Sequence, residues 1–448
     1  MSEVLHGNIS KHILKQSGIL LMGVLMLASF MLIDVYFISQ LGSDSLAAVS
    51  YATPVMSLLV SLLLGMGAGM VVVVSNAAGS NNHFQLKQYL SSSLSLSLLA
   101  GLILLLILFS GSAYLFRQLG AEGEVLEQLL AYFEVLSLGM FFLSLLVCVT
   151  SLARALGNHK LLTFTMLLLV VVNAVLDPLL IFGYWGFPRM GIAGAAWATT
   201  LAIFVSMWLP LPYLWNELSK SRHSGWELGF FFHWKRIMAM AFPIILANGL
   251  VPLGNTVFVR LLSEFGDATV AAYGAGSRID MLVILSFTSL TAVLAPFVGQ
   301  NLGAGNYDRA YQGFRYGVVC AIIFGLGAAL GATWFNEDIS RIFATDQHVF
   351  QALADYLTIV PWGYAANGFV MISLTTLNVH QRPWWATGVA LGHLFLFYLP
   401  IAYGATLAGS FYGVLTAYPF SHILAAALAY YLLHRVQSFK MMKLEVSG

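Results

Sequence analysis

The sequence predicts an all-α polytopic membrane protein with twelve transmembrane helices in two six-helix bundles. Hydrophobic residues make up 59% of the 448 residues and charged residues only 9%, whereas soluble domains carry about 25% charged residues. Apolar runs of about twenty residues follow one another with short polar gaps, which is typical of membrane-spanning helices. The second half also repeats the first, so we expect the bundles to be related by a pseudo-two-fold axis along the membrane normal.

The hydrophobic runs place the spans in order along the chain. The first run is too long for the core of a signal peptide, so it is retained as a membrane helix. Gly or Pro residues interrupt the fourth, tenth and eleventh spans, where we expect kinks. The expected spans are 13–40, 47–75, 88–110, 128–153, 161–183, 192–216, 237–262, 269–297, 311–334, 349–376, 386–405 and 412–434.

Lysine and arginine residues predict the orientation of the chain. With the N-terminus in the cytoplasm, fifteen of the twenty Lys and Arg residues fall on the inner side. Because inner loops carry an excess of these residues, both termini are expected to be cytoplasmic. The composition does not indicate a nucleic-acid partner, since the sequence has no basic tract. We therefore expect a multi-pass protein of a bacterial-type inner membrane, in contact with the lipid bilayer and acting as a monomer.

The longest inner connection, residues 217–236, divides the chain. It has basic ends and a dense aromatic cluster, which suits either a linker lying on the inner membrane surface or an ordinary aromatic belt. The predicted domains are an N-lobe at 1–216, this cytoplasmic linker, and a C-lobe with a short cytoplasmic tail at 237–448.

The two halves resemble each other in sequence. The segment 32–38 resembles 253–259, and the segment 76–81 resembles 301–306. Each match is weak alone, but the order and the nearly constant offset predict an internal duplication. Six spans per repeat give both halves the same orientation, and a cavity between such halves is the usual place for a transport site.

Two carboxylates lie within strongly apolar sequence. Asp34 is the only charge of its run, and Asp177 follows Asn173 by one helical turn and precedes Pro178. A charged group near the bilayer centre costs at least about 2.5–3.5 kcal/mol, so such an acid suggests function. The alternative is that each acid is a structural group bonded to a neighbouring helix. In the second half Asn255 replaces Asp34, so the buried charge is expected in the N-lobe alone.

These residues are expected to meet at one depth. Counting from the predicted span ends at a rise of about 1.5 Å per residue, Asp34 and Asp177 both lie about 10 Å below the outer edge. Thr199 comes out at a similar depth beside Asn173, and Tyr132 lies just inside the fourth span. Two carboxylates in one pocket of low dielectric cannot both stay ionised at low cost, which suits proton uptake and release. Carboxylate, amide and hydroxyl oxygens could instead hold Na⁺.

Other residue patterns limit the remaining functions. Cys148 and Cys320 lie in apolar runs and are interpreted as free packing thiols, with neither a disulfide nor a metal site. The sequence has no GxxxxGK string, so it does not indicate an ATP-driven transporter. It also has no HExxH or GxGD string, so it does not indicate a membrane enzyme. We therefore expect no metal and no cofactor. Asp280 and Asp355 are placed near the outer span ends, so the C-lobe is expected to contain no deep acid.

The residues that bind the substrate cannot be predicted from the sequence. Methionine adapts to varied ligands, although most methionines in such spans pack or face lipid. The cavity candidates are Met31, Met56, Met140 and Asn255.

Several of these motifs together resemble the multidrug and toxic compound extrusion (MATE) family, and most closely its DinF-type branch. They are Asp34 followed by the segment 40–49, the segment 154–158, the Asn-x3-Asp-Pro motif at 173–178, and the Gly/Ala-rich segment 191–199. The resemblance covers nearly the whole chain, including twelve spans in two bundles. The Asn-x3-Asp-Pro motif with the Asp34 stretch is fairly specific, whereas the Gly/Ala-rich strings are not.

The resemblance implies an exporter that uses H⁺ or Na⁺ to expel cationic, amphipathic compounds. It also implies that Asp34, Asn173, Asp177, Thr199 and Tyr132 form the cation-binding network. Two features depart from the family pattern. The inner half of the first span has no proline at which to bend, although Gly18 or Gly23 lies there, and the deep C-lobe acids of the NorM-type branch are not expected here.

The sequence therefore indicates a secondary active multidrug exporter rather than an enzyme. Protonation of Asp34 and Asp177 would drive alternating access, with H⁺ as the expected coupling ion and Na⁺ as the alternative. A second hypothesis is a lipid-linked sugar flippase or metabolite transporter of related fold. The lack of deep Lys or Arg for anionic substrates counts against it.

Overall fold

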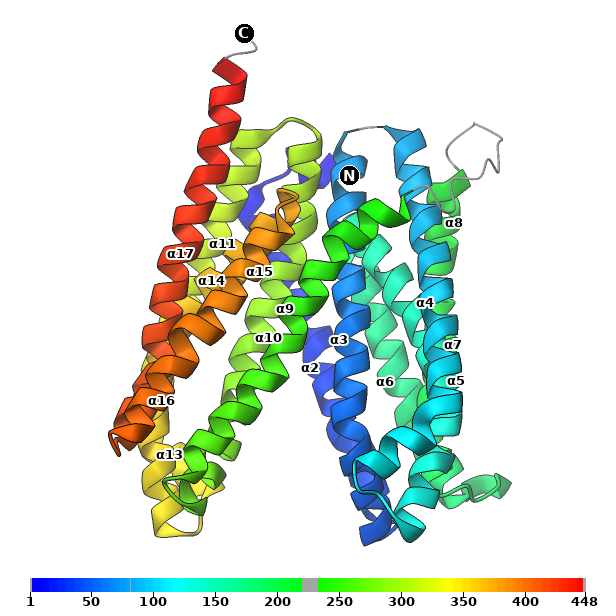
Figure 1. Cartoon of the computed structure of the whole chain (residues 1–448). Helices are drawn as coiled ribbons and strands as arrows, with labels where there is room; N and C mark the ends of the chain where they lie inside the picture. The colour runs from blue at the N-terminus through cyan, green and yellow to red at the C-terminus, as the bar shows by residue number, and fades with distance from the viewer. Residues whose placement is uncertain (1, 81, 220–232, 446–448) are drawn as a thin grey trace. The chain divides into compact units, whose positions relative to one another are not determined.

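The computed structural model describes residues 2–80, 82–219 and 233–445, and the secondary structure in these ranges is helical throughout (Figure 1). Twelve helices or helix pairs in these ranges are long and apolar enough to cross a membrane. The predicted fold class and the number of spans are thereby confirmed. The predicted linker 217–236 falls largely on residues 220–232, outside the described ranges.

The helices of the first repeat follow one another with short connections. They are α1 (Ser2–His6), α2 (Ile9–Ser39), α3 (Ser43–Gly79), α4 (His83–Gln118), α5 (Gly123–Ala155), α6 (His159–Phe182), the 3₁₀ turn η1 (Tyr184–Gly186), α7 (Ile192–Met207) and α8 (Leu211–Ser219).

The second repeat has more breaks. Its elements are α9 (Trp234–Ser263), α10 (Asp267–Gly303), α11 (Tyr307–Trp334), α12 (Asn336–Phe343), α13 (Gln347–Ile359), η2 (Val360–Gly363), α14 (Tyr364–Val379), α15 (Pro383–Leu391), η3 (Gly392–Tyr398), α16 (Leu399–Leu407) and α17 (Phe411–Glu445).

Two of the three spans with an expected kink contain a segment that is not α-helical. The tenth span changes to a 3₁₀ turn at η2, which contains Pro361, because proline has no N–H to continue an α-helix. The eleventh contains the π-helical segment η3. The fourth span, α5, is one continuous helix. Its Gly139 instead lies against Thr200 of α7, where a Cβ would come within 2.6 Å of the hydroxyl oxygen.

The chain folds into two compact units. Unit 1 contains residues 15–241, and unit 2 contains residues 2–14 together with 242–448. The first helix of each repeat is therefore shared: α2 begins in unit 2 and continues in unit 1, whereas α9 begins in unit 1 and continues in unit 2. The predicted N-lobe at 1–216 had included residues 2–14.

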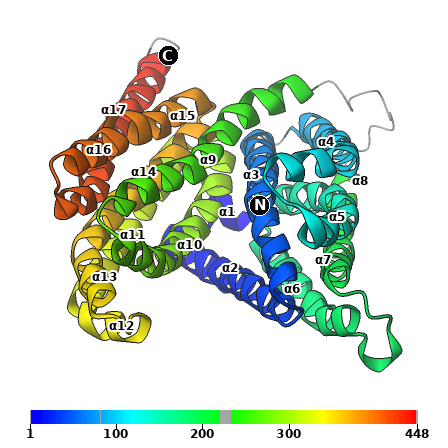
Figure 2. The ribbon, with the colours of Figure 1, turned by 60° about the horizontal axis from the view of Figure 1, so that its bottom comes forward.

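Within unit 1, α6 and α7 form a tight antiparallel pair (Figure 2). Gly183 ends α6 in the left-handed conformation, with φ 77°. The returning chain donates hydrogen bonds from the N–H groups of Met190 and Gly191 to the carbonyls of Leu180 and Ile181. Gly194 then allows α7 to approach closely, because a Cβ there would lie 2.4 Å from the Leu180 carbonyl oxygen. This pairing places the middle of α7 beside the middle of α6.

Candidate ion-coupling site

Asp34 and Asp177 lie at matching positions on two helices of unit 1. Asp34 is five residues before Ser39, the end of α2, and Asp177 is five residues before Phe182, the end of α6. At about 1.5 Å per residue, each acid is therefore about 7–8 Å from its helix end. Thr199 is seven residues after the start of α7. Thr199 therefore lies about 10–11 Å from the start of its helix, and the common depth in the membrane stays a prediction.

Asn173 connects the acid of α6 with the hydroxyl of α7. Its Nδ2 donates to Asp177 Oδ1 over 3.3 Å and to Thr199 Oγ1 over 3.2 Å. The first bond follows from the spacing of four residues, which puts both side chains on one helix face. The second follows from the antiparallel pairing that Gly194 permits. Asn173 and Asp177 are both completely buried.

Several oxygens of this cluster have no hydrogen-bond partner among the residues that the structure describes. They are Asp34 Oδ1, Asn173 Oδ1 and Asp177 Oδ2. Buried polar atoms normally have a hydrogen-bond partner, and leaving one without costs about 1–3 kcal/mol. The arrangement therefore suits a species that these oxygens would bind, such as a proton shared by a carboxyl group or a small cation.

The two acids and Tyr132 interact electrostatically. Tyr132 of α5 is 8% exposed and lies within the field of both carboxylates, and the carboxylates also interact with each other. Among the residues that the structure describes, no ion pair joins Asp34 or Asp177 to an arginine or lysine; pairs such as Arg260–Glu264 and Arg341–Glu337 are exposed and lie in unit 2. Two like charges in this setting favour binding of a cation.

Pro178 weakens α6 next to its acid. A proline inside a helix has no N–H, so the carbonyl of Ala174 lacks its usual donor from the next turn. Such breaks in the backbone ladder are tolerated in membrane helices, where the freed carbonyl can be satisfied by other partners. The five predicted cation-binding residues are thus contributed by α2, α5, α6 and α7, all within unit 1.

Asp280 is a buried acid that the sequence reasoning missed. It lies 13 residues after the start of α10, at 9% exposure, so the prediction that the C-lobe has no deep acid was wrong. Tyr356 and Tyr364 donate their hydroxyl protons to its two carboxylate oxygens. These tyrosines come from 76 and 84 residues further along the chain, and no local pattern reveals them. Because both oxygens are satisfied, Asp280 differs from the acids of unit 1.

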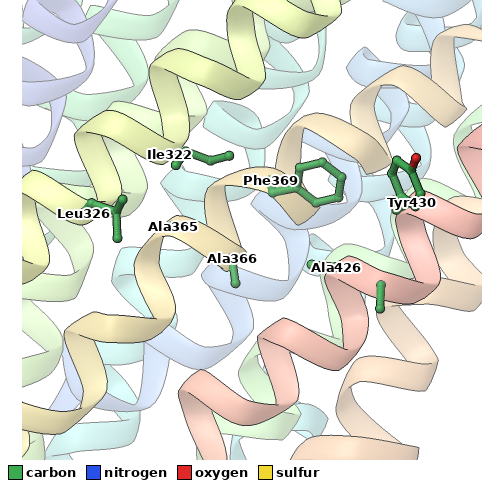
Figure 3. A pocket seen from close by; sticks show the side chains of 8 residues that line it. Ile322, Leu326, Ala365, Ala366, Phe369, Ala426 and Tyr430 are labelled. Carbon is green, nitrogen blue, oxygen red and sulfur yellow. The ribbon is translucent and has the colours of Figure 1, made fainter.

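Two hollows lie in unit 2. An apolar groove of about 420 Å³ is lined by α11, α14 and α17 (Figure 3), and a second hollow of about 760 Å³ lies beside Asp267, Asp346 and Asp355. Neither contains the predicted cavity residues. Met140 is buried, Met56 is partly buried and Asn255 is exposed, whereas the side chain of Met31 lies outside the described residues. The substrate-binding residues therefore stay a prediction.

Comparison with known proteins decides the family. The family described as MatE matches residues 20–179 and, a second time, residues 243–404. The two matches cover more than half of the chain. This chain belongs to the MATE family. One match in each half agrees with the internal duplication, and the family consists of transporters, so the chain is a multi-pass membrane transporter and not an enzyme.

Individual relatives of this MATE chain have different names. The FAD transporter of Shewanella oneidensis is 32% identical over 93% of this chain and 92% of its own length. The probable multidrug resistance protein YoeA of Bacillus subtilis is 26% identical over 81% and 79%. The solved MATE transporter VcmN of Vibrio cholerae in its bent form is 26% identical, has a TM-score of 0.90, and covers 96% of this chain and 97% of its own.

Proposed function

We propose that this MATE transporter is an exporter of the inner membrane of a bacterium that works by antiport with H⁺. In this proposal it belongs to the DinF-type branch, acts as a monomer and has both termini in the cytoplasm. The coupling site consists of Asp34 and Asp177 with Asn173, Thr199 and Tyr132. The observation that carries the proposal is the set of partnerless carboxylate and amide oxygens buried together in the described part of unit 1.

The mechanism follows from the charge of this cluster. A proton entering from outside binds one of the two carboxylates and removes their mutual repulsion. Neutralisation changes the relative stability of the states open to each side. Transport requires that proton and substrate prefer different states, because binding both states equally shifts nothing. A membrane potential adds about 2.3 kcal/mol for each charge per 100 mV.

Na⁺ is the alternative coupling ion. The same oxygens, Asp34 Oδ1, Asn173 Oδ1 and Asp177 Oδ2, are of the type that hard cations bind. A proton needs only one of them, whereas Na⁺ needs several at once. An experiment with separate H⁺ and Na⁺ gradients therefore distinguishes the two coupling ions.

Two substrate classes are candidates. Cationic amphipathic compounds are supported by two relatives, the probable multidrug resistance protein YoeA and the multidrug export protein MepA of Staphylococcus aureus. FAD is supported by one specific observation, the 32% identity over almost the whole length to an FAD transporter. FAD carries a diphosphate, so a chain that exports it must provide cationic or amide donors in its cavity.

The proposal is tested in vesicles that contain the purified protein. Export of ethidium and of FAD is followed separately under an H⁺ gradient without Na⁺, and under a Na⁺ gradient without an H⁺ gradient. Wild type is compared with Asp34→Asn and Asp177→Asn, which keep side-chain size but remove the charge. Size-exclusion elution and melting temperature in detergent check that both variants fold like wild type.

Wild type is expected to export under the H⁺ gradient. The export rate should fall at least about tenfold in both variants, because a tenfold loss corresponds to about 1.4 kcal/mol of lost coupling free energy. Export that needs Na⁺ would replace the ion but keep the site. Full activity of both variants would show that the acids are structural and would refute the proposed coupling site. Export of neither compound would point to a metabolite or lipid-linked substrate.

A further inference from the structure

Residues 2–14 are built into unit 2, although the helix that they begin continues in unit 1. Ile13 is completely buried in one cluster with Phe287 and Leu294 of α10 and Tyr364 of α14. The ring of His12 lies 5.9 Å from that of Phe297. Residues 2–14 are thus packed as part of unit 2, whereas Asp34 on the same α2 belongs to unit 1.

Arg309 of α11 fastens this segment. Its Nε and Nη2 donate to the carbonyl of Val4 over 3.2 and 3.1 Å, and Nη2 also donates to the carbonyl of Gly7. Asn301 donates to the same Val4 carbonyl over 3.4 Å. The last carbonyls of a helix have no hydrogen-bond partner within it. The guanidinium of Arg309 therefore supplies donors to the carbonyls at the end of α1, and its positive charge interacts favourably with the helix dipole there. Arg309 also lies over the ring of Phe297, 5.5 Å from its centre.

The first helix of the second repeat is likewise divided between the two units. The start of α9, residues 234–241, belongs to unit 1 although the rest of α9 belongs to unit 2. There Arg236 lies 5.8 Å from the centre of the Tyr89 ring, and Trp234 Nε1 donates to Ser95 Oγ over 3.0 Å. A Cβ on Gly69 would come within 2.7 Å of the Ala241 backbone. Because the first helix of each repeat is fastened in this way, the feature is built into the fold.

We propose that Arg309 is a positioning residue for ion coupling. It holds the N-terminal end of α2 on unit 2, while the same helix presents Asp34 to Asp177 within unit 1. About 30 Å of helix, at about 1.5 Å per residue, separates Leu14 from Asp34. A change at Asp34 on ion binding therefore reaches unit 2 through a continuous helix only while that end is fixed. The inference rests on the proposed coupling role of Asp34.

The test measures coupling rather than export alone. Vesicles report proton entry with an internal pH dye and efflux of ethidium or FAD, whichever the wild type exports. Arg309→Ala is compared with Arg309→Lys, which keeps the charge but loses the planar fork that reaches two carbonyls. The matched control is Arg315→Ala, the same change six residues later on α11, where the arginine is exposed and lies over Tyr311.

Arg309→Ala is expected to reduce substrate exported per proton about fivefold or more. Proton entry without substrate should rise and KM for the substrate should change little. Arg309→Lys should show a smaller loss in the same direction, and Arg315→Ala should resemble wild type. Normal coupling in Arg309→Ala would overturn the inference. A purely structural role would lower the amount of folded protein without changing substrate per proton, and that result would overturn it as well.

A covalent tie provides the decisive control. The side chains of Ser10 of α2 and Tyr316 of α11 interact. Cysteines at these two positions can therefore be joined by a short bifunctional thiol reagent, because a direct disulfide would need closer Cα atoms, after Cys148 and Cys320 are replaced by Ala. Joining them should restore coupling to Arg309→Ala. If the same tie stops export in the protein with Arg309, the segment must detach during transport and the inference is wrong. Asp34→Asn in the same vesicles distinguishes failure of this inference from failure of the proposed function. If the proposed function is wrong, Asp34→Asn keeps its export. If only this inference is wrong, Asp34→Asn loses its export.

Discussion

At the scale of single residues, the buried acids of the two units differ in how their oxygens are satisfied. Asp280 accepts a hydrogen bond on each oxygen, whereas Asp34 and Asp177 each keep an oxygen without a partner in the described ranges. A satisfied buried acid can serve packing alone, but a partly satisfied one is expensive unless something binds it. This difference supports the proposed roles, a structural acid in unit 2 and coupling acids in unit 1, and hydrophobicity along the sequence does not reveal it.

Asp280→Asn should accordingly keep proton-coupled export. An amide of the same size can still bond to Tyr356 and Tyr364, since a phenol hydroxyl both donates and accepts. We expect a lower melting temperature in detergent but an unchanged number of protons per substrate. Loss of coupling in a folded Asp280→Asn protein would show that unit 2 contains a second coupling acid.

Asn173→Leu should impair export more than Thr199→Val. Leucine removes the donor that reaches both Asp177 and Thr199, whereas valine removes only one acceptor. We expect Asn173→Leu to lower the rate of H⁺-driven export about tenfold or more and Thr199→Val a few-fold, in line with the net strength of one to two hydrogen bonds to a charged group. The measurement is the initial export rate at saturating substrate. Equal effects would argue against a central position of Asn173.

Asp346 gives a pH-dependent contribution to stability outside the membrane. Hydrogen bonds from the backbone N–H groups of Val349 and His348 lower the pKa of this carboxyl below its usual value. A lowered pKa stabilises the folded protein above the unfolded value of about 3.9, and this stabilisation is lost as the pH falls through the folded value. Asp346→Ala should therefore lower the melting temperature at pH 7, and the difference from wild type should shrink towards pH 3. A difference independent of pH would contradict the cap.

At the scale of helices, the pairing of α6 with α7 positions the site. The sequence predicted both spans and the shared face of Asn173 and Asp177, because helical spacing alone determines them. It also predicted kinks in the tenth and eleventh spans, where the structure has the non-α segments η2 and η3. It did not reveal the burial of Asp280, because that depends on tyrosines of α13 and α14 that only the tertiary fold brings near.

Gly194→Val tests this pairing. The new side chain would begin 2.4 Å from the Leu180 carbonyl oxygen, so α7 must move away and take Thr199 from Asn173. We expect a clear loss of both melting temperature and export. Gly111→Val on α4 is the matched control, since a Cβ there meets no described atom within 4 Å. Normal export by Gly194→Val would mean that the Asn173–Thr199 contact is dispensable.

At the scale of the whole molecule, the duplication was visible in the sequence, and the family matches each half separately. The assignment of residues 2–14 to unit 2 was not predictable. It depends on contacts of Val4 and Gly7 with Arg309, 305 and 302 residues away, and a backbone carbonyl leaves no signal in the sequence. The predicted lobes followed the order of the chain, whereas the packed units exchange the first part of α2 and of α9.

The most direct test of the central claim is proton entry driven by substrate. Vesicles are loaded with the exported compound and an internal pH dye, with no imposed ion gradient, and efflux is started by dilution. The account predicts acidification of the interior as substrate leaves, absent in Asp34→Asn and Asp177→Asn and retained in Asp280→Asn. Substrate efflux with equal acidification in all four proteins, or in none, would contradict the assignment of proton coupling to the two acids of unit 1.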